Sequence, residues 1–250
     1  MVAFDRMSEK PQLTTLERIG HGILRRLSPH HRARTDLFIS PYADWVEWLS
    51  GLGDHGHVLY GLTRALRPRT IVEIGSARGK STCIFALACA DNGVGRVHAI
   101  DPHQQNDWTD VNTGGHTLNF LRERLSTYDL EQHCTVIPMT SQDAAAVWSG
   151  GPIDFLFIDG NHEYLGVRSD FELFKPFLNP GALVAFHDSS WEHEGPWERF
   201  SKEKWFREDM GVPRYLEELQ AQGYESVTLP ATPGLTLMYP SAEKFRFRAS

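Results

Sequence analysis

From residue 58 onward, short apolar runs alternate with segments in which apolar residues recur at helical spacing. Five apolar or β-branched runs predict strands: residues 70–74 (TIVEI), 95–100 (GRVHAI), 134–139 (CTVIPM), 153–158 (IDFLFI) and 181–186 (GALVAF). Between and before them, apolar residues at spacings of three and four predict helices over residues 58–66, 81–90, 118–125 and 164–178. Continuous apolar strands separated by helices are typical of a parallel sheet that is covered on both faces.

Both ends of the chain depart from this alternation. Apolar residues at positions 13, 16, 19, 23 and 27 predict an amphipathic helix, and a basic, His-rich stretch follows it. We expect residues 1–57 to form a helical appendage that caps the domain or contacts a second copy; contact with an anionic membrane is the alternative. The main domain then covers residues 58–250, with a Trp-rich lid or insertion over residues 191–211.

The C-terminal part predicts a helix over residues 212–222 and two strands within residues 225–239, joined by a Pro-Gly turn. A terminal hairpin places one strand antiparallel to the others. The sequence therefore predicts an α/β, Rossmann-like fold. Its sheet is mostly parallel and seven-stranded with one antiparallel strand, it has helices on both faces, and the N-terminal helical appendage is added to it.

Composition narrows the class of protein. The 250 residues carry 41% hydrophobic and 23% charged residues, as an ordinary soluble globular protein does, and a formal net charge of −7. An acidic balance argues against a nucleic-acid partner. We find no bilayer-spanning run and no signal-peptide pattern at the start, and the three cysteines lack metal-type spacing. Buried free thiols and a cytoplasmic location are therefore expected.

The first chemical signal is the segment VEIGSARGKS at residues 72–81, where a buried strand runs into a Gly-containing turn and then a helix. Three residues separate Gly75 from Gly79, one fewer than a nucleotide-triphosphate P-loop needs. A dinucleotide-binding loop would have glycine at Ala77 and no carboxylate at Glu73. A cationic ligand suits Glu73 better, and the sulfonium and amino groups of S-adenosylmethionine are both cationic.

Two further loops carry candidate cofactor contacts. Asp101 ends the second strand, 26 residues beyond Gly75, where an acidic residue can accept both ribose hydroxyls; a solvated turn before Pro102 is the alternative. After the third strand, residues 140–143 (TSQD) occupy the loop where an adenine ring would lie. Ser141 and Gln142 are small polar side chains that can bond its edge.

Two carboxylates end neighbouring strands. Asp159 follows the fourth strand and Asp188 the fifth, 29 residues apart, which is one strand-helix-strand unit. Both therefore fall at the ligand-binding edge of the sheet, beside His187. The negative charges of two carboxylates among apolar strands need a compensating positive charge, which a divalent cation supplies. The oxygen ligands favour Mg²⁺ or Mn²⁺, and His187 as a further ligand also allows a softer metal. The alternative is that both residues cap the turns that follow.

The ordered set VEIGSARGKST, VHAIDP and FLFIDGNHEYLGVRSDFELFKPFLNPGALVAFHD resembles the class I S-adenosylmethionine-dependent methyltransferases over residues 60–189. Within that class it is similar to the branch of macrolide and deoxysugar O-methyltransferases and cephalosporin-hydroxylase-like proteins. The resemblance implies S-adenosylmethionine held by Glu73, Gly75 and Asp101, and a metal held by Asp159 and Asp188. Other expected cofactor contacts lie on the same loops: Ser76, Ser81, Ser141, Gln142 and Asp159.

The expected reaction is methyl transfer to a metal-oriented hydroxyl, which is largely a matter of proximity and alignment. A base must take the proton, and His162 is the first candidate, with His187 second. For His162 the alternative is a supporting role behind the metal ligands or in the core. The resemblance favours a sugar, a glycosylated natural product or a polysaccharide precursor as acceptor and a homodimer as the assembly.

Six tryptophans can supply stacking faces for such an acceptor or can simply pack: Trp45, Trp48, Trp108, Trp191, Trp197 and Trp205. Two other functions stay open at this point. One is a metal-dependent hydroxylase that uses Asp159, His162 and His187 as a facial ligand set. The other is an inactive S-adenosylmethionine-binding partner protein.

Overall fold

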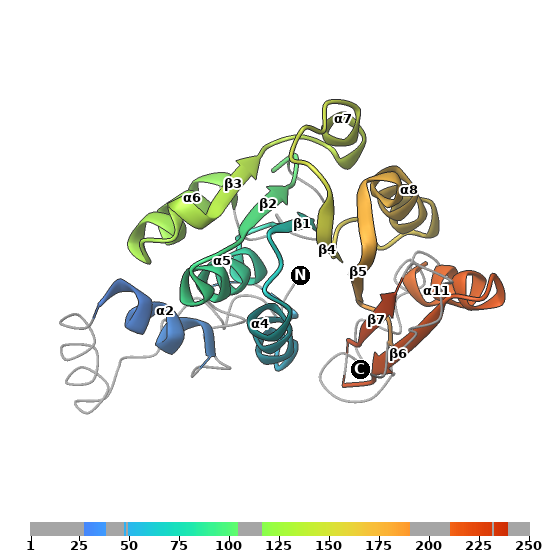
Figure 1. Ribbon diagram of the computed structural model, residues 1–250, viewed down its shortest axis with the longest axis horizontal. Coiled ribbons are helices and arrows are strands. Elements are labelled where there is room, and N and C mark those ends of the chain that lie inside the picture. The colour runs from blue at the N-terminus through green and yellow to red at the C-terminus, as the bar shows by residue number, and fades with distance from the viewer. Residues whose placement is uncertain are drawn as a thin grey trace, which may run out of the picture.

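A seven-stranded sheet organises the computed structural model, which describes residues 28–38, 48, 50–104, 117–190, 211–231 and 233–239. The strand order is β3-β2-β1-β4-β5-β7-β6. Strands β1 to β5 pair in parallel, whereas β7 is antiparallel to both β5 and β6. The expected arrangement, mostly parallel with one antiparallel strand, is confirmed (Figure 1).

The strands are short and follow the predicted runs closely. They are β1 (Thr70–Ile74), β2 (Arg96–Ile100), β3 (Cys134–Ile137), β4 (Ile153–Ile158), β5 (Leu178–His187), β6 (Glu225–Leu229) and β7 (Leu235–Tyr239). The helices are α2 (Pro29–Phe38), α4 (His55–Leu66), α5 (Lys80–Asn92), α6 (Thr117–Thr127), α7 (Ser141–Ala146), α8 (Tyr164–Phe174) and α11 (Val212–Ala221). Two single 3₁₀ turns, η2 (Glu131–His133) and η3 (Lys175–Phe177), complete the described elements.

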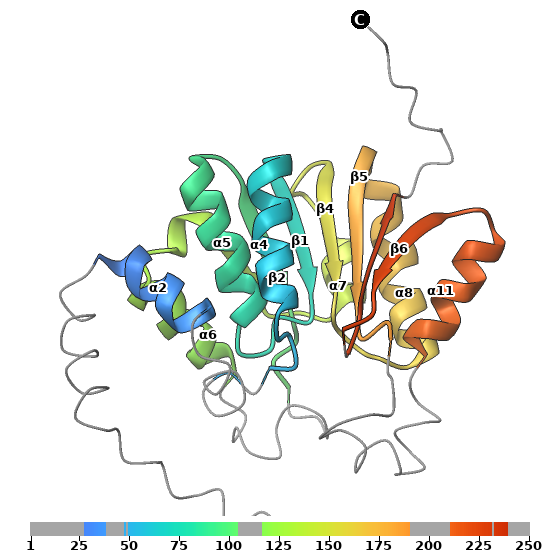
Figure 2. The ribbon, with the colours of Figure 1, turned by 90° about the horizontal axis from the view of Figure 1, so that it is seen from below.

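Helices cover both faces of the sheet, as the sequence predicts (Figures 1 and 2). Because successive strand residues point to opposite faces, Ile71 packs with α2, α4, α5 and α6, while Val72 packs with α7, α8 and α11. The middle strands are apolar on both sides: Phe155 and Leu156 of β4 are both fully buried, in different clusters. This double burial explains why the central strands lack polar alternation.

Three local features differ from the sequence prediction. Residues 140–143 are not a loop: Thr140 caps the short helix α7, its hydroxyl accepting from the N–H of Asp143 at 3.1 Å. The helix predicted to reach residue 178 ends at Phe174 and tightens into η3, because Pro176 has no N–H to continue the α-helical ladder. The fifth strand begins three residues earlier than predicted, at Leu178.

The basic stretch after the predicted N-terminal helix is itself helical, forming α2. Ala33 and Leu37 are buried in the core cluster around α5, and Arg34 forms an ion pair with Asp91. The predicted helix over residues 13–27 and the predicted lid over residues 191–211, apart from Gly211, lie outside the described residues.

The composition leads us to expect buried free thiols and no membrane-spanning helix. All three cysteines are buried free thiols, as predicted. Among the residues that are described, no helix is long and apolar enough to cross a bilayer.

Candidate active site

The loop after β1 reaches the carboxyl ends of its neighbouring strands. Gly75 has φ +89°, and its N–H donates to the Ile100 carbonyl at the end of β2 over 2.9 Å. A Cβ on Gly75 would lie 2.1 Å from the Asp159 carbonyl oxygen. Only glycine allows this approach, which brings the β1 loop against the loop after β4. Contact of Gly75 with a cofactor stays a prediction.

Glu73 fastens the end of β1 to the start of α5. Its side chain is fully buried, and its carboxylate accepts hydrogen bonds from the hydroxyls of Ser81 and Thr82 (2.5 Å for Thr82). Burial raises the pKa of Glu73 to about 8, although the two hydroxyl bonds act in the opposite direction. The bond between Glu73 and Ser81 thus helps to fix the shape of the glycine loop, because it joins the strand before the loop to the helix after it. Their direct contact with a cofactor stays a prediction.

Asp101 lies at the end of β2, as predicted, and organises two loops through main-chain donors. Its Oδ2 accepts from the Ala77 N–H at 2.8 Å, and its Oδ1 accepts from the His103 N–H at 2.6 Å. The side chain keeps 17% of its surface exposed. Next to this pair of loops, the buried Ser76 Oγ has no hydrogen-bond partner within the part of the chain that the structure describes. A buried hydroxyl without a protein partner is free to bond a ligand or a water molecule.

Ser141 begins α7, and its hydroxyl is directed into the protein rather than outward. It donates to the Asp170 carboxylate of α8 at 2.5 Å, while Gln142 beside it is exposed. Asp170 is 5% exposed, and burial raises its pKa to about 6. A Cβ on Gly160 would lie 3.0 Å from Asp170 Oδ2, so the same carboxylate also borders the loop after β4. Sequence reasoning missed Asp170, because it looks like an ordinary polar position of an amphipathic helix.

The ends of β4 and β5 bring four titratable groups together. His187 Nδ1 lies 3.1 Å from both Asp159 Oδ1 and Asp188 Oδ2. His162 Nε2 lies 3.0 Å from Asp188 Oδ2 and 3.8 Å from Asp159 Oδ1. The His187 side chain is 3% exposed, whereas that of His162 is 19% exposed. His187 therefore contacts the carboxylates from the buried side and His162 contacts them from the open side.

These contacts shift the pKa values of both imidazoles and of one carboxylate. Burial alone would lower the pKa of His162, but the charge of Asp188 and hydrogen bonds to both carboxylates raise it to about 10. The same two carboxylates outweigh burial at His187 and raise its pKa well above the usual range. The two imidazoles in turn hold the pKa of Asp188 well below its usual value, against the effect of burial.

The donor set fits a divalent cation. One ligand atom from each of Asp159, His162 and Asp188 lies within 4.8 Å of the others, a spacing that one ion can bridge. Ser189, next in sequence, has a buried Oγ with no hydrogen-bond partner among the described residues. Mixed oxygen and nitrogen ligands suit Mn²⁺ as well as Mg²⁺. The role of His187 as a ligand stays a prediction, while the geometry adds His162 to the groups that can reach an ion.

A fifth group lies behind this cluster and comes from a helix that sequence reasoning left out of the site. His55, the first residue of α4, places its Nδ1 3.3 Å from His187 Nε2, and the two rings meet edge to face at 84°. Its side chain is buried, at 3% exposure. Burial, followed by the charge of His187, lowers the pKa of His55 to about 4. Its separation of 132 residues from His187 leaves no signal in the sequence.

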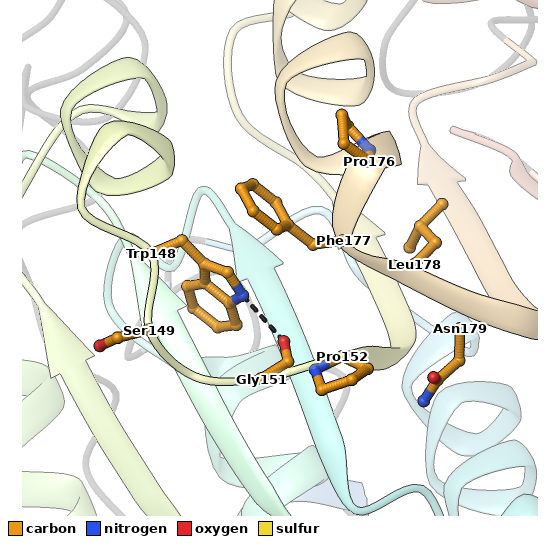
Figure 3. Close-up of a pocket in the computed structure, with 8 residues that line it drawn as sticks. All are labelled: Trp148, Ser149, Gly151, Pro152, Pro176, Phe177, Leu178 and Asn179. Carbon is orange, nitrogen blue, oxygen red and sulfur yellow. Dashed lines mark hydrogen bonds between the residues drawn. The ribbon is translucent and has the colours of Figure 1, made fainter.

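A surface hollow lies at the other end of the strands and takes no part in this arrangement (Figure 3). It is bordered by Pro152, just before β4, and by Leu178, the first residue of β5. Trp148 forms one wall, and its indole N–H donates to the Gly151 carbonyl at 2.9 Å. Asp159 and Asp188 stand at the opposite ends of the same two strands.

Comparison with known proteins agrees with this geometry. Residues 72–189, which contain the glycine loop, Asp101 and the cluster at Asp159 and Asp188, match a family model described as a methyltransferase domain. The matched segment carries the residues on which the resemblance to class I S-adenosylmethionine-dependent methyltransferases rests, so the match agrees with that resemblance.

Two curated relatives are each 26% identical to this chain: the uncharacterized protein y4gI of Sinorhizobium fredii over 204 residues, and the uncharacterized protein R132 of Acanthamoeba polyphaga mimivirus over 144 residues. The matches cover 81% and 54% of this chain. They span 20% of the length of the first relative and 58% of the second.

Solved structures share the fold at low identity. The O-methyltransferase TomG of Streptomyces achromogenes, involved in tomaymycin synthesis and solved with S-adenosylmethionine, has a TM-score of 0.57 at 18% identity over 91% of this chain and 99% of its own. The S-adenosylhomocysteine-bound methyltransferase PaMTH1 of Podospora anserina has a TM-score of 0.60 at 14% identity over 92% and 97%. A Bacillus cereus O-methyltransferase with S-adenosylhomocysteine has a TM-score of 0.57 at 16% identity over 86% and 99%.

Proposed function

We propose that this chain is a metal-dependent O-methyltransferase that moves the methyl group of S-adenosylmethionine to a hydroxyl of a small molecule. The observation that carries the proposal is the cluster of Asp159, His162 and Asp188, which lies next to the loops that hold Gly75 and Asp101. The Gly75 position abuts the Asp159 carbonyl, so the cofactor loop and the candidate metal ligands share one edge of the sheet. Methyl transfer needs that adjacency, because donor and acceptor must lie in line.

On the cofactor side, Asp101 is placed to accept the ribose hydroxyls with its exposed surface, while Ala77 and His103 hold its orientation. The hydroxyl of Ser76 would bond the cofactor next to it. Glu73 keeps the loop shaped through Ser81 and gives its surroundings a negative potential that suits a sulfonium when the carboxyl is ionised.

We expect the start of α7 to bind the adenine end of the cofactor. We infer that Ser141 and Gln142 border the adenine ring, with Gln142 the more exposed of the two. Because the Ser141 hydroxyl donates to Asp170, its side chain is held in one orientation at this border.

On the acceptor side, Asp159 and Asp188 would hold the cation, which makes an acceptor hydroxyl more acidic and orients it. His162 contacts the two carboxylates from the more exposed side, so we assign it the role of base once a bound cation offsets the carboxylate charges that raise its pKa. His187 faces the same carboxylates from within the protein, at 3% exposure. Its position suits orientation of the carboxylates better than direct contact with an acceptor.

We propose a sugar or glycosylated natural product as the acceptor, and a homodimer as the assembly. Both proposals rest on the family resemblance. The proposed acceptor is also supported by the likeness to TomG, an O-methyltransferase involved in tomaymycin synthesis. Of the six tryptophans considered as stacking faces, five lie outside the described residues. Trp48 is buried and packs edge-on against Phe120, so it contributes to the core and not to an acceptor surface.

Calorimetric titration of metal-stripped protein with S-adenosylmethionine, repeated with Mg²⁺ and followed by assays on a panel of sugars and glycosides, tests the proposal. We expect micromolar binding and methylation that depends on Mg²⁺ or Mn²⁺. The variant Asp188→Asn should keep cofactor affinity and lose metal-dependent turnover. Absence of cofactor binding under all conditions would refute the assignment, and turnover unaffected by chelator would refute its metal part.

A further inference from the structure

We infer that His55 is a positioning residue for the metal site: its imidazole fixes the orientation and tautomer of His187, which in turn aligns the Asp159 and Asp188 carboxylates for the cation. The inference rests on the proposed metal dependence. The two histidines come from separate elements, the start of α4 and the end of β5. His55 Nδ1 lies 3.3 Å from His187 Nε2, and both side chains are 3% exposed.

The hydrogen-bonding capacity of His187 explains why it needs a partner on its far side. A single nitrogen, Nδ1, lies 3.1 Å from both carboxylates, and carboxylates are acceptors only. Nδ1 must therefore carry the proton, whatever the charge of the ring. With Nδ1 committed to the carboxylates, Nε2 is the nitrogen left for a hydrogen-bond partner on the buried side of the ring.

His55 supplies that partner. A neutral imidazole carries one proton, and Nδ1 is the His55 nitrogen that faces His187. His55 Nε2 is buried without a hydrogen-bond partner within the described part of the chain, so the bond to His187 is the polar contact that orients the ring there. The rings also meet edge to face, which restricts rotation of His187 away from the carboxylates.

The backbone around His55 fixes the position from which its side chain extends. It is the first residue of α4, and its N–H donates to the Leu52 carbonyl at 3.1 Å. The next residue, Gly56, packs so tightly that a Cβ there would lie 2.9 Å from Ile84 Cδ1 of α5. The start of α4 is thus pressed onto α5, and His55 has little freedom to move relative to β5.

Mn²⁺ binding, followed by electron paramagnetic resonance or calorimetry, tests this role without relying on turnover. His55→Leu removes the partner and should weaken Mn²⁺ binding by about 10- to 100-fold, the effect typical of losing the hydrogen-bond partner behind a metal site, with unchanged S-adenosylhomocysteine affinity. His55→Asn places an amide N–H near the position of the imidazole Nδ1 and should restore most of the loss. His98→Leu, a histidine that packs on Trp148, serves as the matched control and should not change Mn²⁺ affinity.

Wild-type Mn²⁺ affinity in a folded His55→Leu variant overturns the inference and leaves the proposed function standing. A wild-type protein that binds S-adenosylhomocysteine but no Mn²⁺ overturns both. If His55→Leu does not fold, nitrogen-15 spectra of the Mg²⁺-loaded wild type decide, with His187→Gln used for assignment. Nitrogen–nitrogen coupling across a hydrogen bond between His55 Nδ1 and His187 Nε2 is the expected result, and absence of that coupling overturns the inference.

Discussion

The main-chain N–H of Ala77 donates to the Asp101 carboxylate at 2.8 Å, which joins the glycine loop after β1 to the end of β2. Ala77 has φ +41°, an uncommon conformation for a residue other than glycine. The bond offsets that conformational cost and turns the loop toward the strand end where a ribose would lie. Asp101 therefore shapes the loop, and the proposed bond to the cofactor would use its exposed surface.

Asp101→Asn should weaken S-adenosylmethionine binding by about 10-fold or more. Both carboxylate oxygens accept main-chain N–H groups, from Ala77 and His103, and an asparagine amide nitrogen cannot accept either one. Calorimetric titration measures the effect. Asp129→Asn is the matched control, because Asp129 is exposed beyond α6 and its φ of +57° is tolerated by asparagine. Equal affinity for the two variants would contradict the role of Asp101.

Gly75→Ala should destabilise the protein and abolish cofactor binding. An added Cβ would lie 2.1 Å from the Asp159 carbonyl, so the β1 and β4 loops would have to separate. Gly93→Ala isolates the backbone part of the effect, since Gly93 also has a positive φ, +65°, but nothing lies within 4 Å of its added Cβ. We expect a loss of about 1 kcal/mol for Gly93→Ala and clearly more for Gly75→Ala. Thermal unfolding with and without S-adenosylhomocysteine distinguishes them.

Glu73→Gln should change stability in favour of the variant as the pH rises, on top of a pH-independent loss because the amide nitrogen cannot accept one of the bonds from Ser81 and Thr82. The pKa of Glu73 is raised from 4.5 to about 8 by burial, so the protonated form is favoured in the folded state. Its stabilising contribution is complete below pH 4.5 and is lost as the pH rises through about 8. The glutamine side chain carries no charge at any pH, so the melting temperatures of variant and wild type should diverge between about pH 5 and 9. Parallel curves across that range would show that burial does not raise this pKa.

His162→Ala should lower turnover strongly while S-adenosylmethionine affinity stays within about 2- to 3-fold of wild type. Its Nε2 contacts the carboxylates of Asp159 and Asp188, on the side of the site where we propose that the acceptor binds. Measurement of turnover and of the Kd values for cofactor and Mn²⁺ separates its two candidate roles. Retained Mn²⁺ affinity supports the base, whereas loss of Mn²⁺ affinity in step with turnover would identify His162 as a metal ligand instead.

The order of strands and helices could be predicted from local sequence, because the periods of 2 and 3.6 residues are local properties of the chain. The shared edge of Asp159 and Asp188 could be predicted too: a single strand-helix-strand unit separates them, and the crossover connection makes their strands parallel. The β4 run at residues 153–158 agrees residue for residue with its prediction, since burial on both faces leaves an unbroken apolar run.

The packing of the whole chain was needed to establish which histidine faces solvent and which is buried, because that depends on how each loop leaves its strand. It was also needed to show that Ser141 bonds Asp170 and that His55 contacts His187 across 132 residues. Such contacts depend on the rotation and docking of α4 and α8 against the sheet. Helix periodicity fixes which face of a helix is apolar, but not which polar side chain at its end meets a partner far along the chain.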